Sequence, residues 1–360
     1  MKILYLDTPL NPPGGGQISL INILKNARWE SAVCLSSDGE FHDMLLRHGL
    51  NAVISPPHKL FSIIKKISPD IIHSNSAATR YTFSGAVISG WLGIPFIWHN
   101  RVIESAPLRE KIIAALSSRI IIISDAVGEK FKSPWIKQKT VKIYNGVDTG
   151  EFAPRPHNDI PKDKILREIG INNVSGQEKI IGVFSRLERW KGHTLFLKAF
   201  AQGVRSAGFP LKALIVGGGG GDAESEIKAL AVNSGILNHV IFAGYRRDVA
   251  QLMNICDVIV NPSLEPEPFG RTVIEAMSCG KPVIATNMGG PGEIIANWAD
   301  GILTEPNPES MADAILRVIS DDKLADRIGK AARQKVIKFF SIDRQIEELE
   351  NLYKEVLTKP

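Results

Sequence analysis

Short apolar runs alternate with stretches of helical periodicity along the whole chain. In the first half, the runs predict strands at 2–6, 31–35, 52–54, 71–73, 95–98, 120–123 and 141–144. In the second half, they predict strands at 180–185, 212–216, 240–243, 258–261, 282–285 and 301–303. A short continuous apolar run is typical of a strand buried on both faces, so each half is expected to hold a parallel sheet covered by helices.

Two domains fit both the length and the pattern. A chain of 360 residues is too long for one ordinary hydrophobic core. The stretch 149–178 is rich in Pro, Asp, Asn and Lys, which indicates a linker. We therefore expect an α/β domain at 1–150, a linker region at 151–178, a second α/β domain at 179–340, and a C-terminal helix at 341–360 that is able to pack back on the first domain.

The most informative segment is 261–280, which reads NPSLEPEPFGRTVIEAMSCG. It follows a predicted strand and opens a helix at about 270–272, with Glu267 just before the helix and Glu275 about one turn into it. The backbone N–H groups of a helix N-terminus suit a phosphate, and carboxylates accept hydrogen bonds from sugar hydroxyls. The segment therefore predicts a nucleotide-sugar site. Parallel sheets place such sites at the carboxyl ends of their strands, so two facing sheets would hold the active site between the domains.

Several motifs spread over the chain occur together in one known family. They are Gly14-Gly15-Gly16, Asn145-Gly146-Val147-Asp148, Ser185-Arg186-Leu187 with Lys191-Gly192, Glu267-Pro268-Phe269-Gly270, Glu275-Ala276-Met277 and Gly289-Gly290-Pro291. Together they resemble family 4 glycosyltransferases. The resemblance implies the GT-B fold, with two facing Rossmann-like domains, parallel sheets and a cleft between them. It also implies a retaining hexosyltransferase-type enzyme that moves a sugar from a UDP- or GDP-sugar to a hydroxyl.

The resemblance assigns roles in the second domain. Arg186 and Lys191 would hold the donor diphosphate and the leaving group, because both side chains neutralise phosphates. Glu267 would bind a hydroxyl of the transferred sugar and Glu275 the ribose, whereas Glu265 has the wrong spacing. The other candidate donor-binding residues are Arg246, Arg247, Phe269, Gly270, Arg271 and Thr272. For the charged residues the plain alternative is a solvated surface position, and for the helix start it is ordinary capping.

The first domain carries fewer signals. Gly15 and Gly16 follow the first strand, and by resemblance their loop reaches the donor phosphate or the acceptor. Glycines let the backbone approach a ligand closely, although a plain flexible turn is the alternative. His99 follows the strand 95–98 and by resemblance contacts the transferred sugar, although a lone histidine is more often structural. Asn100 stands where the family often has an acid, and His73-Ser74-Asn75 where it often has His-x-His. These two departures from the family's pattern bear on the acceptor chemistry and not on donor binding.

The glycine run 217–221 offers a rival interpretation. Gly218, Gly220 and Ala223 fit the form Gly-x-Gly-x-x-Ala of dinucleotide sites, but the next strand is followed by Gly244-Tyr245-Arg246, without an acid for a ribose. The run is therefore interpreted as a turn. A nucleotide-sugar epimerase, another NAD-dependent enzyme and a non-catalytic nucleotide-sugar binding protein remain alternatives, because fold alone separates none of them.

The sequence limits which metals and cofactors the protein is expected to use. No two aspartates are separated by a single residue, and no Cys/His cluster is present. Metal-independent chemistry without a cofactor is therefore expected, with cationic side chains and a helix N-terminus in place of a metal ion. The three cysteines show no disulfide framework, which favours a reducing cytoplasm.

Charge is uneven along the chain. Residues 1–150 hold 17 Lys and Arg against 11 Asp and Glu, while the remainder is nearly neutral. No formal charge occurs between Arg80 and Arg101, but the glycines and Pro95 within that stretch favour a helix, a turn and a strand over a membrane span. The start has too short an apolar run for a signal peptide. We expect a cytoplasmic enzyme of cell-surface polysaccharide or lipopolysaccharide biosynthesis, with a glycan or lipid-linked acceptor, no nucleic-acid partner, and a basic first half compatible with peripheral contact to the inner face of a membrane.

Overall fold

Two structural units make up the chain. The computed structural model describes residues 1–155, 162–169, 178–219 and 221–358. Unit 1 consists of Met1–Gly146 and Phe340–Pro360, and unit 2 of Val147–Phe339. The predicted linker region 151–178 holds a short helix, α8 (Lys162–Glu168), and its residues 156–161 and 170–177 lie outside the described residues.

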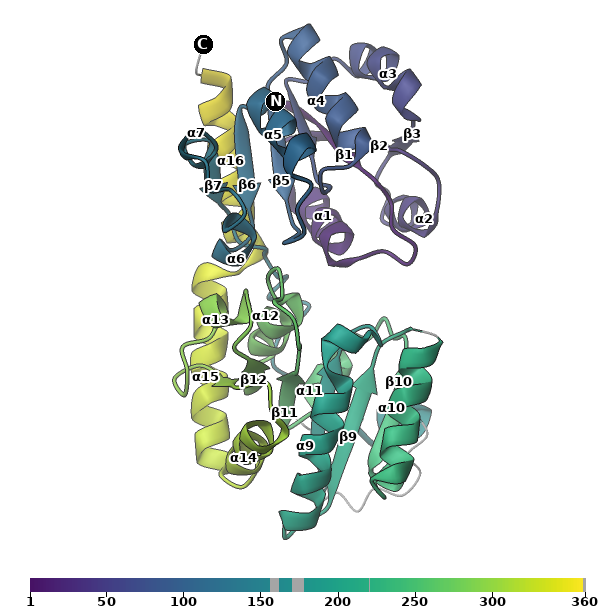
Figure 1. Ribbon diagram of the computed structural model, residues 1–360, viewed down its shortest axis with the longest axis vertical. Helices are drawn as coiled ribbons and strands as arrows, with labels where there is room; N and C mark the ends of the chain where they lie inside the picture. The colour runs from purple at the N-terminus through teal and green to yellow at the C-terminus, as the bar shows by residue number, and fades with distance from the viewer. Residues whose placement is uncertain (156–161, 170–177, 220, 359–360) are drawn as a thin grey trace. The chain divides into compact units, whose positions relative to one another are not determined.

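A seven-stranded parallel sheet forms the centre of unit 1 (Figure 1), in the order β3-β2-β1-β4-β5-β6-β7. Its strands are β1 (Lys2–Asp7), β2 (Glu30–Leu35), β3 (Ala52–Ile54), β4 (Ile71–Ser74), β5 (Phe96–Asn100), β6 (Arg119–Ile122) and β7 (Thr140–Lys142). The helices are α1 (Gly15–Asn26), α2 (Glu40–Arg47), η1 (Pro57–Lys59), α3 (Leu60–Ile67), α4 (Arg80–Leu92), α5 (Pro107–Leu116), α6 (Asp125–Gly128), α7 (Pro134–Lys137) and α16 (Ile342–Thr358). The strand order reverses between β1 and β4, and such a switch point is where open parallel sheets bind ligands.

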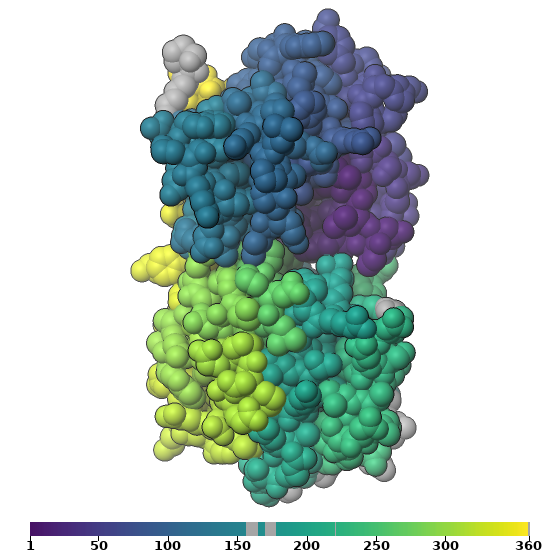
Figure 2. Space-filling view, in the orientation of Figure 1, coloured from purple at the N-terminus to yellow at the C-terminus, as the bar shows by residue number. Residues whose placement is uncertain are grey.

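The last helix completes the core of unit 1. Six apolar or aromatic residues of α16, spaced three or four apart along one face, are buried in the same cluster as residues of β1: Ile342, Ile346, Leu349, Leu352, Tyr353 and Val356. In Figure 1 this helix, in yellow, runs beside the blue elements of unit 1. Few of its atoms are visible in the space-filling view (Figure 2), where blue residues of the first 146 cover it.

A six-stranded parallel sheet forms the centre of unit 2, in the order β10-β9-β8-β11-β12-β13. Its strands are β8 (Lys179–Phe184), β9 (Leu211–Val216), β10 (Val240–Gly244), β11 (Val258–Asn261), β12 (Val283–Thr286) and β13 (Ile302–Thr304). The helices are η3 (Arg189–Lys191), α9 (His193–Ser206), α10 (Asp222–Asn233), η4 (Leu237–His239), α11 (Val249–Ile255), α12 (Arg271–Ser278), α13 (Pro291–Ile294), α14 (Pro308–Ile319) and α15 (Asp322–Phe339). Here the switch point lies between β8 and β11.

The predicted class, two α/β units with parallel sheets, is confirmed. The predicted helix, turn and strand across the uncharged stretch are also found, since α4 ends at Leu92 and Gly93 caps it in the left-handed region with φ of 67°. The predicted end of the strand after that turn was wrong, because β5 does not stop at Trp98 but continues through His99 and Asn100, whose backbones pair with β6. Over the described part of the chain, every helix is too short or too polar to cross a membrane.

Candidate functional site

Charged residues of unit 2 follow the two strands at its switch point. Ser185 and Arg186 come directly after β8, and the loop that carries Glu267 comes after β11. Because β8 and β11 pair side by side in parallel, their carboxyl ends lie at the same edge of the sheet. The two loops are also joined directly, since the backbone N–H of Leu264 donates to the carbonyl oxygen of Trp190 at 2.7 Å.

Lys191 and Glu267 form an ion pair at this edge. The Nζ atom of Lys191 lies 2.5 Å from Oε1 of Glu267, and the two side chains are only 15% and 7% exposed. Ser263 donates its hydroxyl to the same Oε1 at 2.6 Å. The Lys191 ammonium also lies 3.8 Å from the centre of the Trp190 ring, close enough for a cation–π contact. Both donors reach one carboxylate oxygen, which leaves Oε2 of Glu267 as a hydrogen-bond acceptor for a ligand.

Glycines hold the Glu267 loop in place. Glu267 pairs as an isolated parallel bridge with Gly289, its N–H donates to Met288, and its carbonyl oxygen accepts from the N–H of Gly290 at 2.8 Å. Gly289 has φ of 75°, and a Cβ atom there would collide with the Glu267 backbone. A Cβ atom on Gly290 would collide with the backbone of Phe269, whose side chain is buried. The Gly-Gly pair is therefore required for the close approach that positions the Glu267 carboxylate.

Helix α12 begins right after this loop. Its N-cap residue, Gly270, has φ of 97°, a conformation that favours glycine. Arg271 donates to Oε1 of Glu275 at 2.6 Å, one turn along the helix. The hydroxyl of Thr272 donates to the carbonyl oxygen of Phe184 at 3.1 Å and thereby ties the helix to the end of β8. Thr272 thus has a structural partner for its hydroxyl hydrogen that the sequence did not reveal.

Three further arginines predicted for the donor site lie on loops of unit 2. The guanidinium of Arg186 lies 3.1 Å from a carboxylate oxygen of Glu188 and is half exposed. Arg246 donates twice to the carboxylate of Asp248, at 2.8 and 2.7 Å. Arg247 is exposed and precedes α11, which begins at Val249.

A buried arginine lies at the switch point of unit 1. The first residues of α1 are Gly15 and Gly16, and a Cβ atom on Gly16 would lie 3.0 Å from Cδ of Arg101. Arg101 therefore packs against the first turn of this helix. Its Nε donates to Oδ1 of Asn75 at 2.8 Å, and one terminal nitrogen donates to Oδ1 of Asn145 at 2.5 Å.

A buried carboxylate lies in the same network. Asp7, at the end of β1, accepts hydrogen bonds from Asn75 at 2.7 Å and from Ser76 at 2.9 Å. Burial raises the pKa of Asp7 to about 6, although the two hydrogen bonds and the charge of Arg101 act in the opposite direction. Asn75 bridges the acid and the guanidinium, so both charged groups have a partner within unit 1.

His99 is fully buried beside Arg101. Its Nδ1 lies 3.1 Å from Nε2 of His73 and 3.3 Å from a terminal nitrogen of Arg101. Its Nε2 is buried and has no hydrogen-bond partner among the described residues. Burial, and then the charge of Arg101, hold the pKa of His99 well below its usual range, so the imidazole is neutral. A buried polar atom without a partner is uncommon and marks a position where a ligand atom would fit.

Comparison with known proteins agrees with this architecture. The family model described as glycosyl transferases group 1 matches residues 165–335. A galactosyltransferase of Escherichia coli, the UDP-Gal:alpha-D-GlcNAc-diphosphoundecaprenol alpha-1,3-galactosyltransferase, is 26% identical over 82% of this chain and 77% of its own length. The solved structure of a Rickettsia africae glycosyltransferase superimposes with a TM-score of 0.88 at 26% identity, covering 100% of this chain and 99% of that one. The structure of Anabaena Alr3699/HepE in complex with UDP-glucose superimposes with a TM-score of 0.85 at 28% identity, covering 99% and 100%. The chain is a glycosyltransferase with the GT-B fold, and its residues 165–335 match the group 1 family.

The predicted site residues of this glycosyltransferase divide between its two units. Unit 1 holds Gly15, Gly16 and His99, and unit 2 holds the rest. Within unit 2 the structure brings Lys191 and Glu267 into contact, whereas Glu265, two residues earlier, is exposed.

The glycine run after β9 is a packed turn in the glycosyltransferase. A Cβ atom on Gly217 would collide with the carbonyl oxygen of Ser185, and one on Gly219 would lie 2.8 Å from Cβ of Leu187. Residue 220, the second glycine of the Gly-x-Gly-x-x-Ala match, lies outside the described residues. Gly217 and Gly219 are thus explained by the close approach of this turn to the loop after β8.

Sequence reasoning missed three polar residues of these networks. Arg101 lies two positions beyond His99, Asp7 ends the first strand, and Ser263 follows β11 by two residues. Their common signal is position, because each lies at or just after the carboxyl end of a strand beside a switch point. A search for polar residues at such strand ends would have found all three.

Proposed function

We propose that this glycosyltransferase moves a sugar from a UDP- or GDP-sugar to a hydroxyl of a glycan or lipid-linked acceptor, with retention of anomeric configuration, in the assembly of cell-surface polysaccharide or lipopolysaccharide. The observation that carries the proposal is the Lys191–Glu267 pair at the unit 2 switch point, directly before the N-terminus of α12. It combines a cation for phosphate, an acceptor for a sugar hydroxyl and backbone donors for an anion. The Escherichia coli relative's name and the UDP-glucose complex of the Anabaena protein support the choice of donor and acceptor classes.

Stabilisation of the leaving diphosphate is the central chemical task. When the bond to the sugar breaks, negative charge develops on the diphosphate and positive charge on the sugar ring. Arg186, Lys191 and the N-terminal turn of α12 are the groups that would stabilise the diphosphate, with Thr272 and the backbone of Gly270 and Arg271 close by. Among residues 1–155, 162–169, 178–219 and 221–358, no group of three or more His, Cys, Asp or Glu could hold a metal ion. We propose that these protein groups act without a metal.

Glu267 suits binding better than nucleophilic attack. One of its oxygens already accepts from Lys191 and Ser263, which stabilises the carboxylate and lowers its reactivity. Its Oε2 would accept a hydroxyl of the transferred sugar, and Glu275 would accept the ribose hydroxyls. Without a protein nucleophile, the departing phosphate would take the proton of the acceptor hydroxyl on the same face of the sugar, which retains the configuration.

Calorimetric titration with UDP, GDP, ADP and NAD, in metal-free buffer, tests the proposal. We expect one nucleoside diphosphate to bind and Lys191→Met to weaken it at least tenfold, because a cation on the phosphates is lost. Lys198→Met, which removes an exposed lysine of α9, is the matched control and should bind like the wild type. Binding of NAD alone would overturn the proposal. Donor binding without any turnover or donor hydrolysis would instead indicate a non-catalytic binding protein.

A membrane-linked acceptor is supported by one surface of unit 1. Trp91 at the end of α4 is 80% exposed and Leu108 at the start of α5 is 77% exposed, and Ile112 and Leu116 continue the α5 stripe at four-residue spacing. Exposed Trp and Leu side chains, in a unit whose sequence carries an excess of Lys and Arg, favour contact with anionic lipid. We expect sedimentation with vesicles that contain phosphatidylglycerol, lost in Trp91→Ser with Leu108→Ser. Equal sedimentation of the variant would contradict this surface as the contact.

A further inference from the structure

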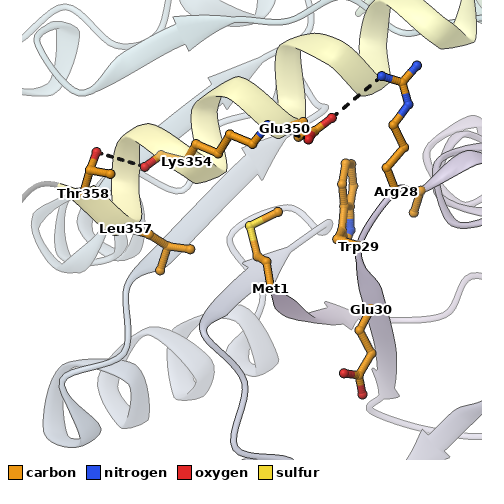
Figure 3. Close-up of a pocket in the computed structure, with 9 residues that line it drawn as sticks. Met1, Arg28, Trp29, Glu30, Glu350, Lys354, Leu357 and Thr358 are labelled. Atoms are coloured by element: carbon orange, nitrogen blue, oxygen red, sulfur yellow. Dashed lines mark hydrogen bonds and ion pairs between the residues drawn. The ribbon is translucent and has the colours of Figure 1, made fainter.

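A chain of buried hydrogen bonds connects His99 to the far side of unit 1. Trp29 Nε1 lies 3.1 Å from the hydroxyl oxygen of Tyr5, which lies 3.1 Å from the hydroxyl oxygen of Tyr353 on α16. That oxygen lies 2.7 Å from Nδ1 of His73, whose Nε2 lies 3.1 Å from Nδ1 of His99. The chain begins at a surface groove between α16 and β2, where the Trp29 ring forms part of the wall (Figure 3).

At each end of this series of hydrogen bonds lies a residue whose polar group can donate a hydrogen bond but cannot accept one. The indole of Trp29 has a single N–H and no acceptor, so Tyr5 must accept at that end. The guanidinium of Arg101 has no acceptor either, so Nδ1 of His99 must accept at the other end. The donor and the acceptor of every hydrogen bond between these two ends are then fixed, in an order that we call the forward direction. Tyr5 donates to Tyr353, Tyr353 donates to Nδ1 of His73, and Nε2 of His73 donates to Nδ1 of His99.

If each of these hydrogen bonds ran in the reverse direction, two buried groups would be left without a suitable partner. The hydroxyl hydrogen of Tyr5 would have no acceptor among the described residues, since Tyr5 would then accept from both Trp29 and Tyr353. An N–H on Nδ1 of His99 would also face the Arg101 guanidinium at 3.3 Å, so that two hydrogen-bond donors would point at each other. A buried donor without a partner costs about 1–3 kcal/mol, so the forward direction is strongly favoured.

The forward direction fixes the tautomer of His99. Because Nδ1 accepts, the neutral ring carries its proton on Nε2. Both imidazoles are neutral, since burial lowers the pKa of His73 to about 3 and that of His99 well below its usual range. Nε2–H of His99 is therefore a buried donor with no partner among the described residues, and a ligand that satisfies it must offer an oxygen acceptor.

We propose that His73 and Tyr353 are positioning residues that hold His99 in its Nε2–H tautomer, so that His99 presents a hydrogen-bond donor and not a base to a neutral oxygen of the transferred sugar. The inference rests on the proposed function for the identity of that ligand. It adds two residues that were not among the predicted site residues, one of them on the C-terminal helix. It also excludes His99 as the group that deprotonates the acceptor, because its basic nitrogen is occupied by His73 and Arg101.

The tautomer of His99 can be measured by NMR in the absence of catalytic turnover. In protein labelled with 15N-histidine, two-bond proton–nitrogen spectra at pH 7.5 distinguish the two neutral tautomers, and loss of one set of signals in His99→Gln assigns His99. We expect Nε2–H in the wild type. Tyr353→Phe, which removes the donor to His73, should add a second tautomer at His99. An Nδ1–H ring or an imidazolium in the wild type would overturn the proposal.

Activity supplies the second measurement. Tyr353→Phe should lower kcat for transfer or donor hydrolysis about three- to tenfold, the value of one neutral hydrogen bond. Binding of UDP should be unchanged, because the nucleotide-binding residues proposed above lie in unit 2. Ile346→Val on the same helix is the control for a packing defect and should leave both the tautomer and kcat unchanged. An unaltered His99 spectrum together with an unaltered kcat in Tyr353→Phe would overturn the positioning role, whereas absence of any transferase activity with the expected spectrum would count only against the proposed function.

Discussion

The Lys191–Glu267 pair gives each of its members two tasks. The ammonium stabilises the buried carboxylate, and it is also the cation proposed for the donor phosphates. Removal of one partner from a buried ion pair leaves an uncompensated charge, which destabilises by about 3–5 kcal/mol. Loss of activity in a Lys191 variant therefore needs a stability measurement beside it, and a substitution at Glu267 that keeps the shape of the side chain is the cleaner probe.

Glu267→Gln should reduce kcat/KM about 10- to 100-fold. The amide keeps the shape of the side chain but loses a charged acceptor, and a hydrogen bond to a charged group contributes about 1.5–3 kcal/mol. Glu265→Gln is the matched control, because Glu265 is exposed two residues earlier. Steady-state kinetics with the donor identified by calorimetry provide the measurement. A larger loss in Glu265→Gln would show that the wrong acid was chosen.

Candidate site residues could be picked out from the sequence, but their hydrogen-bond and ion-pair partners could not. Lys191 and Glu267 stood out as candidates, yet they are 76 positions apart, and only the fold brings them to 2.5 Å. Thr272 was a candidate for donor binding, and the structure adds a partner that the sequence did not reveal, because its hydroxyl donates to the Phe184 carbonyl oxygen on β8. Hydrogen-bond partners depend on tertiary packing, which local sequence patterns do not encode.

At the scale of elements, the strands were predictable because a parallel sheet demands apolar residues on both faces. Their ends were less certain where polar side chains continue the strand. β5 extends through His99 and Asn100, because backbone pairing with β6 does not depend on apolar side chains. The same limit explains Ser74 at the end of β4. These polar strand ends are the positions where the buried networks of unit 1 lie.

Helix α16 should be indispensable for unit 1. A chain that stops after Phe339 lacks six buried side chains of that core, each contributing about 1.5–3 kcal/mol, which matches or exceeds the 5–15 kcal/mol that stabilises a typical domain. We expect amides of β1 and β4 to exchange rapidly in this truncated protein, as measured by hydrogen exchange with mass spectrometry. Amides of β8 and β11 in unit 2 are the internal control and should stay protected. Protection of β1 in the truncated chain would contradict this account.

For the whole molecule, buried histidines predict sensitivity to acid. Burial lowers the pKa of His73 to about 3 and that of His193 to about 4, from 6.5, and also lowers that of His99. The unfolded chain therefore binds more protons than the folded one below pH 6.5, so stability falls as the pH drops through that window, by about 1.4 kcal/mol per pH unit for each histidine. Asp7 acts oppositely, since its folded pKa of about 6 lies above 3.8, and stability from this group rises on acidification between those values.

Three histidines outweigh Asp7 and Glu348, two acids whose pKa burial raises, so the free energy of unfolding should fall between pH 7.5 and pH 5. Urea unfolding followed by circular dichroism at several pH values measures this. His193→Gln should make the pH dependence shallower, whereas His48→Gln, at an exposed position, should leave it unchanged. A protein that becomes more stable on acidification would show that Asp7 or other buried acids dominate.

The division of unit 1 into two segments has a consequence during synthesis. Residues 147–339, which form unit 2, are contiguous, whereas unit 1 needs both the first 146 residues and the final helix. A chain that leaves the ribosome from its N-terminus at about 5–20 residues per second would therefore expose the Ile3, Tyr5 and Leu20 surface for the time that about 200 further residues take to emerge, on the order of 10–40 seconds. The unit translated second is thus the first able to close its core, and the nascent first unit is the natural client for a chaperone.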